Sequence, residues 1–96
     1  MKGGKVTDFV DHTTYEECAV RYHGTKYFFR GLIYEEQKKA YSYDIEIWDD
    51  HGCHVKTVFD KTAYSAVQCM EMAQREPIFD GKSFWEAEQE MEWVEW

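Results

Sequence analysis

Residues 41–59 read YSYDIEIWDDHGCHVKTVF, and this segment indicates the architecture more clearly than any other part of the chain. Large apolar residues first alternate with polar ones, which is the pattern of a strand with one buried and one solvated face. The alternating residues are Tyr41, Tyr43, Ile45 and Ile47. A polar stretch then ends in Gly52, which can adopt the positive φ that tight turns need. Alternation resumes at Val55, Thr57 and Phe59, so the segment predicts an antiparallel hairpin.

The chain before this hairpin predicts one further strand and one undecided segment. Residues 26–36 are rich in aromatic and β-branched side chains, and residues 36–39 supply a polar turn. Residues 11–23 fit two interpretations. A capping-box spacing between Thr14 and Glu17 would open a short helix, whereas apolar residues at 18, 20 and 22 alternate as in a strand.

The chain after the hairpin predicts helices. Asp60 or Thr62 can cap a helix whose apolar side chains recur at helical spacing on one face. That stripe consists of Ala63, Ala66, Val67, Met70 and Ala73. Pro77 cannot continue a helix, which places a break at residues 75–82.

The last fourteen residues, 83–96, carry two overlapping patterns. Ser83 and Glu86 form a capping box, and the apolar residues at 84, 87, 91 and 94 follow a helical spacing. Glutamates at 86, 88, 90 and 92 also alternate as in a strand. Ala, Glu, Gln and Met favour helices, so a helix is preferred here. The expected fold is therefore α+β, with an antiparallel three- or four-stranded meander packed against one or two C-terminal helices.

Length and composition predict a single domain. The 96 residues include 18% aromatic side chains, which can bury enough apolar area for one core. We expect residues 1–8 to be a flexible N-terminus and residues 9–96 to form the domain. Three widely spaced cysteines do not suggest a disulfide framework, and neither a signal peptide nor a membrane span is visible. A cytoplasmic location is expected.

The charge distribution predicts what the protein binds. Lys and Arg number 11 against 19 Asp and Glu, which gives a formal net charge of −8. From residue 49 onward, four cationic side chains face eleven anionic ones, whereas the first half is nearly balanced. A negative field repels phosphate backbones and anionic lipids and favours basic protein surfaces. We therefore expect a protein partner with a basic surface, or self-association as a homodimer, and neither direct nucleic-acid binding nor membrane binding.

Few residues suggest chemistry. His51, Cys53 and His54 are capable of binding a metal and lie beside Asp49 and Asp50, although their spacing is not a zinc pattern and a solvated turn is the simpler interpretation. Cysteines 18 and 69 lie in apolar patterns where cysteine usually packs as a small hydrophobe. We predict no catalytic residues, no metal and no cofactor, and the protein is not expected to be an enzyme.

The acidic, tryptophan-rich end of the chain is the predicted binding surface. Tryptophan is enriched among residues that dominate binding energy, and surrounding negative charge accelerates encounter with a basic partner. The predicted partner-binding residues are Trp85, Glu86, Glu88, Glu90, Glu92, Trp93, Glu95 and Trp96. The alternative is that the tryptophans complete the core while the glutamates keep the surface soluble.

The expected function is that of a small acidic protein-binding module, an inhibitor or adaptor that docks on a basic, nucleic-acid-binding protein surface. In size and charge the chain resembles small anti-restriction, anti-CRISPR and toxin-immunity proteins, although no family motif matches residue by residue. The alternatives are a homo-oligomeric structural domain and a small metal-binding domain that uses His51, Cys53 and His54.

Overall fold

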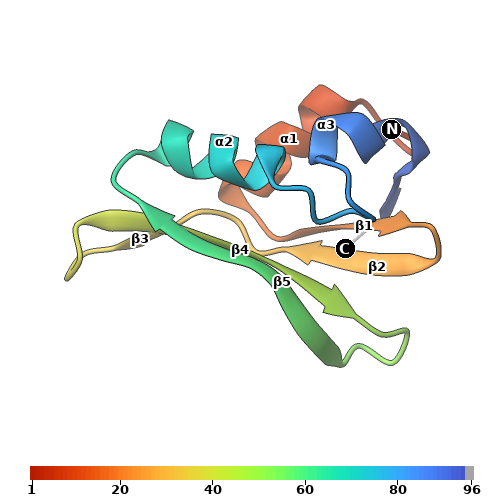
Figure 1. The fold of residues 1–96 in the computed structure, drawn as a ribbon, viewed down its shortest axis with the longest axis horizontal. Coiled ribbons are helices and arrows are strands. Elements are labelled where there is room, and N and C mark those ends of the chain that lie inside the picture. The colour runs from red at the N-terminus through yellow and green to blue at the C-terminus, as the bar shows by residue number, and fades with distance from the viewer. Residues whose placement is uncertain (95–96) are drawn as a thin grey trace.

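A computed structural model describes residues 1–94, which form two layers: an antiparallel sheet and a layer of helices on one of its faces (Figure 1). The helices are α1 Val6–Tyr15, α2 Ala66–Arg75 and α3 Phe84–Ala87, followed by a 3-10 turn at Glu88–Glu90. The strands are β1 Cys18–Tyr22, β2 Thr25–Phe29, β3 Ile33–Glu35, β4 Ala40–Trp48, β5 His54–Ala63 and β6 Glu92–Val94. The α+β class and the antiparallel sheet are as predicted, but the described residues form six strands instead of three or four.

Strand β4 is the centre of the sheet, because it pairs with three other strands. One edge of β4 pairs with β5 along its length. The other edge pairs with β3 at residues 40–42 and with β2 at residues 45–48. The predicted hairpin 41–59 is therefore confirmed as β4 and β5. The predicted strand 26–36 is interrupted at Gly31, whose φ is +85° and where a Cβ would lie only 3.0 Å from the carbonyl oxygen of Glu16.

Helix α2 packs on the sheet and begins later than predicted. Ser65 is the N-cap, since β5 continues to Ala63 and takes up the two residues that had been expected to cap the helix. The predicted stripe is buried at Met70 and Ala73, but Val67 is 67% exposed. The helix ends at Arg75, before Pro77, as predicted.

The expectation of purely C-terminal helices is wrong, because α1 precedes the sheet. Its one fully buried aromatic ring, that of Phe9, contacts the rings of Phe29, Phe84 and Trp93. The capping-box interpretation of Thr14 also fails. The Thr14 hydroxyl donates to the carbonyl of Val10 inside the last turn of α1, and no helix starts there.

The end of the described chain contains both predicted patterns in succession. The Ser83–Glu86 capping box is present and opens α3, which lasts only four residues. After the 3-10 turn the chain becomes β6 and pairs with β1, with Val20 opposite Trp93. Met91, which connects the 3-10 turn to β6, is fully buried. The predicted helix over 83–96 is thus correct only for its first turn, and Glu95 and Trp96 lie outside the described residues.

The N-terminal residues lie beside β6. The backbone N–H of Lys2 donates to the carbonyl of Met91 at 2.9 Å, and the N–H of Trp93 donates to the carbonyl of Lys2 at 2.8 Å. These two bonds extend the sheet by a parallel bridge. No helix within residues 1–94 is long and apolar enough to cross a membrane.

Candidate functional site

Two of the glutamates predicted to bind a partner are held by the protein itself. A carboxylate oxygen of Glu86 accepts the backbone N–H of Ser83 at 3.0 Å in the capping box, and this bond lowers the pKa of Glu86. Glu88 lies 2.9 Å from the amino group of Met1, and its side chain is only 13% exposed. Both carboxylates therefore have structural partners close by.

Glu90 is held by a histidine from the turn between β1 and β2. The ring of His23 stacks on Tyr22 with centroids 4.0 Å apart, which fixes its orientation. Its Nδ1 atom lies 3.0 Å from a carboxylate oxygen of Asp80, and its Nε2 atom lies 3.4 Å from one of Glu90. Hydrogen bonds to Asp80 and Glu90 raise the pKa of His23. One imidazole thus connects three segments that are distant in sequence.

The two described tryptophans of the predicted site have different environments. Trp85 is 49% exposed, and its indole N–H donates to the Gln74 side chain at 3.3 Å. Trp93 is half-buried, with its ring 5.4 Å from Phe9 and 5.5 Å from His12 between centroids. Trp85 is therefore a surface residue at the junction of α2 and α3, whereas Trp93 extends the core.

The remaining residues of the predicted site are only partly described. Glu92 is exposed on β6, in register with Arg21 of β1. Glu95 and Trp96 lie outside the described residues. The end of the chain is therefore a mixture of structural and surface side chains. Glu86, Glu88 and Glu90 make contacts within the protein, whereas Glu92 is exposed without an ion pair in residues 1–94 and Trp85 is 49% exposed.

A second acidic surface lies on the outward side of α1. Asp8, Asp11 and Tyr15 are spaced three and four residues apart, which places them on one helix face, and all three are exposed. Tyr15 is 83% exposed. The carboxylate of Glu16, the next residue, lies 3.2 Å from the His12 ring. A shallow groove is lined by Asp11, His12, Tyr15 and Glu16. Within residues 1–94, Asp8 and Asp11 have no ion pair. We call Asp8, Asp11, Tyr15 and Glu16 the α1 acidic face.

A third group of carboxylates lies on the helix-free face of the sheet. Glu46 is 5% exposed and sits 3.5 Å from the Nε atom of Arg30, which is also 3.6 Å from Asp44. The indole N–H of Trp48 donates to Glu46 at 3.2 Å. Asp60 of β5 is directly opposite Asp44, so two like charges face each other across the strands. Burial, followed by the charge of Glu46, raises the pKa of Asp44. We call Asp44, Glu46 and Asp60 the sheet carboxylates.

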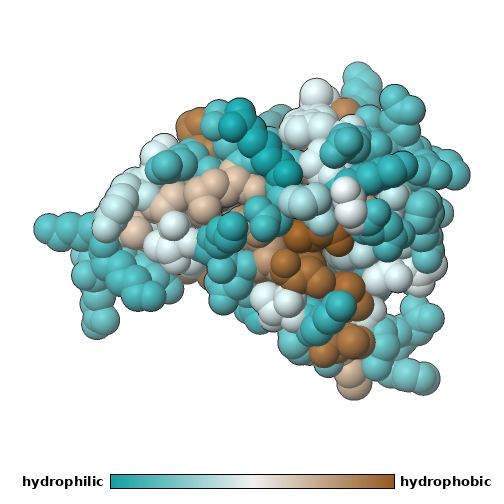
Figure 2. Space-filling view, viewed as in Figure 1, coloured by the Kyte–Doolittle hydropathy of each residue, from teal (hydrophilic) through white to brown (hydrophobic). Residues whose placement is uncertain are grey.

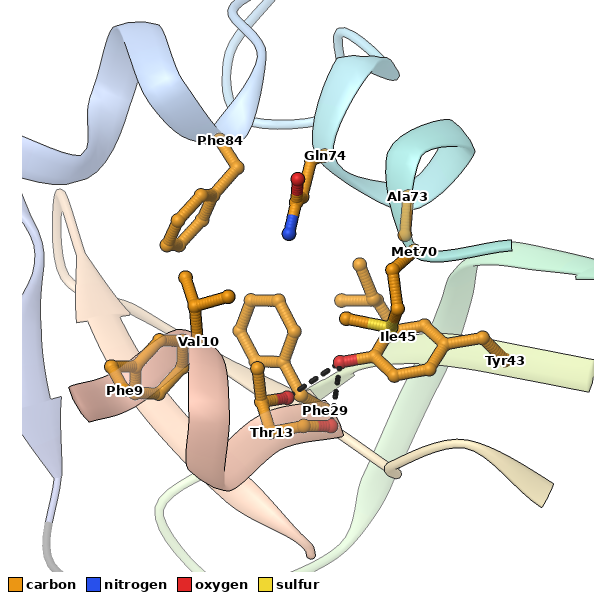
Figure 3. A pocket seen from close by; sticks show the side chains of 10 residues that line it. All are labelled: Phe9, Val10, Thr13, Phe29, Tyr43, Ile45, Met70, Ala73, Gln74 and Phe84. Atoms are coloured by element: carbon orange, nitrogen blue, oxygen red, sulfur yellow. Dashed lines mark hydrogen bonds between the residues drawn. The ribbon is translucent and has the colours of Figure 1, made fainter. Parts of the chain in front are cut away.

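An apolar crevice lies where the helices meet the sheet (Figure 3). Its walls come from all three helices and from β2 and β4, and its volume is about 10 Å³. Ligand pockets usually measure about 300–1,000 Å³. The crevice is therefore a packing gap and holds no small molecule. At its edge the hydroxyl of Tyr43 lies 2.5 Å from that of Thr13 and 3.3 Å from the Thr13 carbonyl, as the dashed lines in Figure 3 show.

The predicted metal alternative has no support from the positions of its residues. Asp49 accepts the backbone N–H groups of His51 and Cys53, both at 2.9 Å, and so closes the turn between β4 and β5. His54 points instead to Glu46 at 3.4 Å. Across residues 1–94, no group of three or more His, Cys, Asp or Glu side chains is placed to hold a metal ion.

The buried thiols are not activated nucleophiles. Burial raises the pKa of Cys18 to about 11, and burial also raises the pKa of Cys69. Because the thiolate is the reactive form, a raised pKa and burial both lower the reactivity of these thiols. They pack as small hydrophobic groups, as predicted.

Comparison of the chain with protein-family models, with curated proteins and with solved structures found no match. Its function must therefore be inferred from its own residues.

Proposed function

We propose that this protein is a small acidic protein-binding module, an inhibitor or adaptor that docks on the basic surface of another protein. The observation that carries the proposal is the α1 acidic face. Asp8 and Asp11 have no cationic partner within residues 1–94, and they lie beside Tyr15, which is 83% exposed. A tyrosine ring offers a large rigid contact, and unneutralised carboxylates around it attract a basic partner.

The surrounding charge supports the same proposal. The formal net charge is −8, so the field outside the protein is negative and will steer cationic surfaces toward it. Free carboxylates gain more from a cationic partner than carboxylates that already have one. We therefore place the docking site on α1, with Trp85 and Glu92 as further exposed contributors from the C-terminal segment. Glu86, Glu88 and Glu90 have structural roles in this proposal.

The test is a comparison of two variants with the same change in net charge. Asp8→Asn with Asp11→Asn removes two of the three carboxylates of the α1 acidic face. Glu36→Gln with Glu71→Gln removes two charges from other exposed positions, of which Glu71 lies 3.9 Å from Arg75. Each protein is immobilised and exposed to extract from its cell of origin at about 50 mM and 500 mM salt, and retained proteins are quantified by mass spectrometry.

The proposal predicts that the unmodified protein retains a basic protein at low salt and releases it at high salt. The α1 variant should lose most of this retention, whereas the control variant keeps it. Equal retention by both variants, or retention of no salt-sensitive protein, would overturn the proposal.

A further inference from the structure

The outer edge of β5 is a free sheet edge. Within the described residues β5 pairs only with β4, and Figure 1 shows it as the outermost strand on its side of the sheet. The half of β5 near the turn is irregular, because its register against β4 shifts twice, leaving Val55 and Val58 without a direct partner. Bulges of this kind discourage edge pairing. The other half, residues 59–63, keeps a regular register and has no such protection.

The direction of the β5 backbone groups follows from a hydrogen bond on the far side of β4. The carbonyl of Asp44 accepts the N–H of Arg30 at 3.2 Å, so the backbone of Asp44 faces away from β5. In an antiparallel pair, two directly opposite residues either both point their backbone groups toward each other or both point them away. The residue opposite Asp44 therefore points its own N–H and C=O away from β4. Asp60 is that residue, and Thr62 follows it with the same orientation. Both residues therefore present unpaired backbone groups at the edge.

A groove lies at the end of β5, between α2 and the start of β4. Its lining residues are Lys38, Ala40, Thr62, Ala63, Tyr64, Gln68 and Met72. Tyr64 is 84% exposed, and Val67 on α2 is 67% exposed. In Figure 2, which has the same view as Figure 1, pale brown apolar surface is visible between α2 and β5. The ammonium group of Lys61 on β5 lies 3.4 Å from Glu76, the residue after α2.

The two sides of the edge thus differ in chemistry. The side facing α2 is mostly apolar, and the helix-free side carries Asp60 next to Asp44. A strand added to β5 would place alternate side chains on these two sides. We propose that the regular half of β5 accepts an extended segment of a partner protein in which apolar residues alternate with Lys or Arg.

The charges on β5 favour a basic partner over a second copy of the chain. Antiparallel pairing of residues 59–63 with the same residues of another copy, in full overlap, would bring Lys61 opposite Lys61. Two molecules of formal charge −8 also repel each other. The inference rests on the proposed function for the class of partner, a basic protein, and adds a second surface with a defined mode of binding.

The experiment uses two synthetic probe peptides and the whole protein. The first peptide alternates Val with Lys over eight residues, and the control alternates Val with Glu. Backbone amide shifts and hydrogen exchange are followed by NMR as each peptide is added. We expect only the Val/Lys peptide to bind and to slow exchange of the Asp60 and Thr62 amides by about ten-fold.

Two variants separate strand addition from simple charge attraction. Thr62→Pro removes an N–H that points away from β4, so the sheet is retained while the added strand loses a hydrogen bond; affinity should fall by about ten-fold. Asp60→Lys keeps every backbone donor and reverses one charge beside the added strand, so it should weaken binding of the Val/Lys peptide. Unchanged affinity in both variants would overturn the inference.

The outcomes also distinguish this inference from the proposed function. Shifts confined to the α1 acidic face would refute strand addition and leave the proposed function intact. Absence of peptide binding, or light scattering that shows a dimer for the unmodified protein and a monomer for Thr62→Pro, would likewise overturn the partner proposed for this edge.

Discussion

The hydroxyl of Tyr43 joins α1 to the central strand, and its removal should destabilise the fold measurably. Tyr43 and Thr13 are 2% and 3% exposed, and their hydroxyls lie 2.5 Å apart. Replacing one partner of a buried hydrogen bond leaves the other unsatisfied, which costs about 1–3 kcal/mol. Tyr43→Phe should fall in this range. Thr13→Val should cost about 1 kcal/mol, near the lower end, because the Tyr43 hydroxyl keeps the Thr13 carbonyl at 3.3 Å.

The double variant provides the decisive measurement. If the two hydroxyls bond to each other, the second substitution removes a group that is already unsatisfied, so the two costs will not add. We expect a coupling free energy of about 1 kcal/mol from urea unfolding followed by tryptophan fluorescence. Tyr34→Phe, which removes a hydroxyl from a ring that is 52% exposed, should change stability by less than about 0.5 kcal/mol. Additive costs in the cycle would refute the proposed bond.

Three further predictions concern the cap, the imidazole and the thiols. Ser83→Ala removes the capping box of α3 and should lower the free energy of unfolding by about 1 kcal/mol in urea. Hydrogen bonds to Asp80 and Glu90 raise the pKa of His23 in the folded protein. The interaction of the protonated ring with these carboxylates should therefore stabilise the fold fully below pH about 6.5, and this stabilisation should be lost as the pH rises through the pKa of the folded protein. NMR titration of the ring protons measures that pKa. In the folded protein a thiol reagent should label exposed Cys53 quickly, and Cys18 and Cys69 only after unfolding.

The elements that were predicted best from the sequence are those in which apolar residues recur at a regular spacing or a proline ends a helix. Strand β4 alternates over most of its length, and Pro77 follows the end of α2. In β5 the strand was predicted correctly but its inward set was not, because only Phe59 is buried whereas Val55 and Thr57 are exposed. Helix α1 was missed because its buried face rests on Phe9 and Thr13, too few residues to produce a helical stripe in a single sequence. It is held by packing of Phe9 against rings from distant segments, which overrides weak local propensity.

The predicted binding site shows a different limit. Counting glutamates locates charge along the chain but cannot show which charges have partners. Glu88 is paired with Met1 and Glu90 with His23, and both contacts join residues far apart in sequence. The free carboxylates of α1 carried a local signal in the spacing of Asp8 and Asp11, but it has meaning only once that segment is known to be helical.

The pairing of β6 with β1 constrains how the protein folds. Strand β1 lies near one end of the described chain and β6 near the other, so the sheet is complete only after almost the whole length has been brought together. Contacts of such long sequence separation form slowly, because the entropy of closing the loop is lost before the contact is gained. Until then the side of Phe9 that contacts Trp93 is bare and the outer edge of β1 is unpaired. A folding intermediate of this kind is prone to aggregate, and variants that weaken β6 should reveal it as poor refolding yield before any loss of the native state is seen.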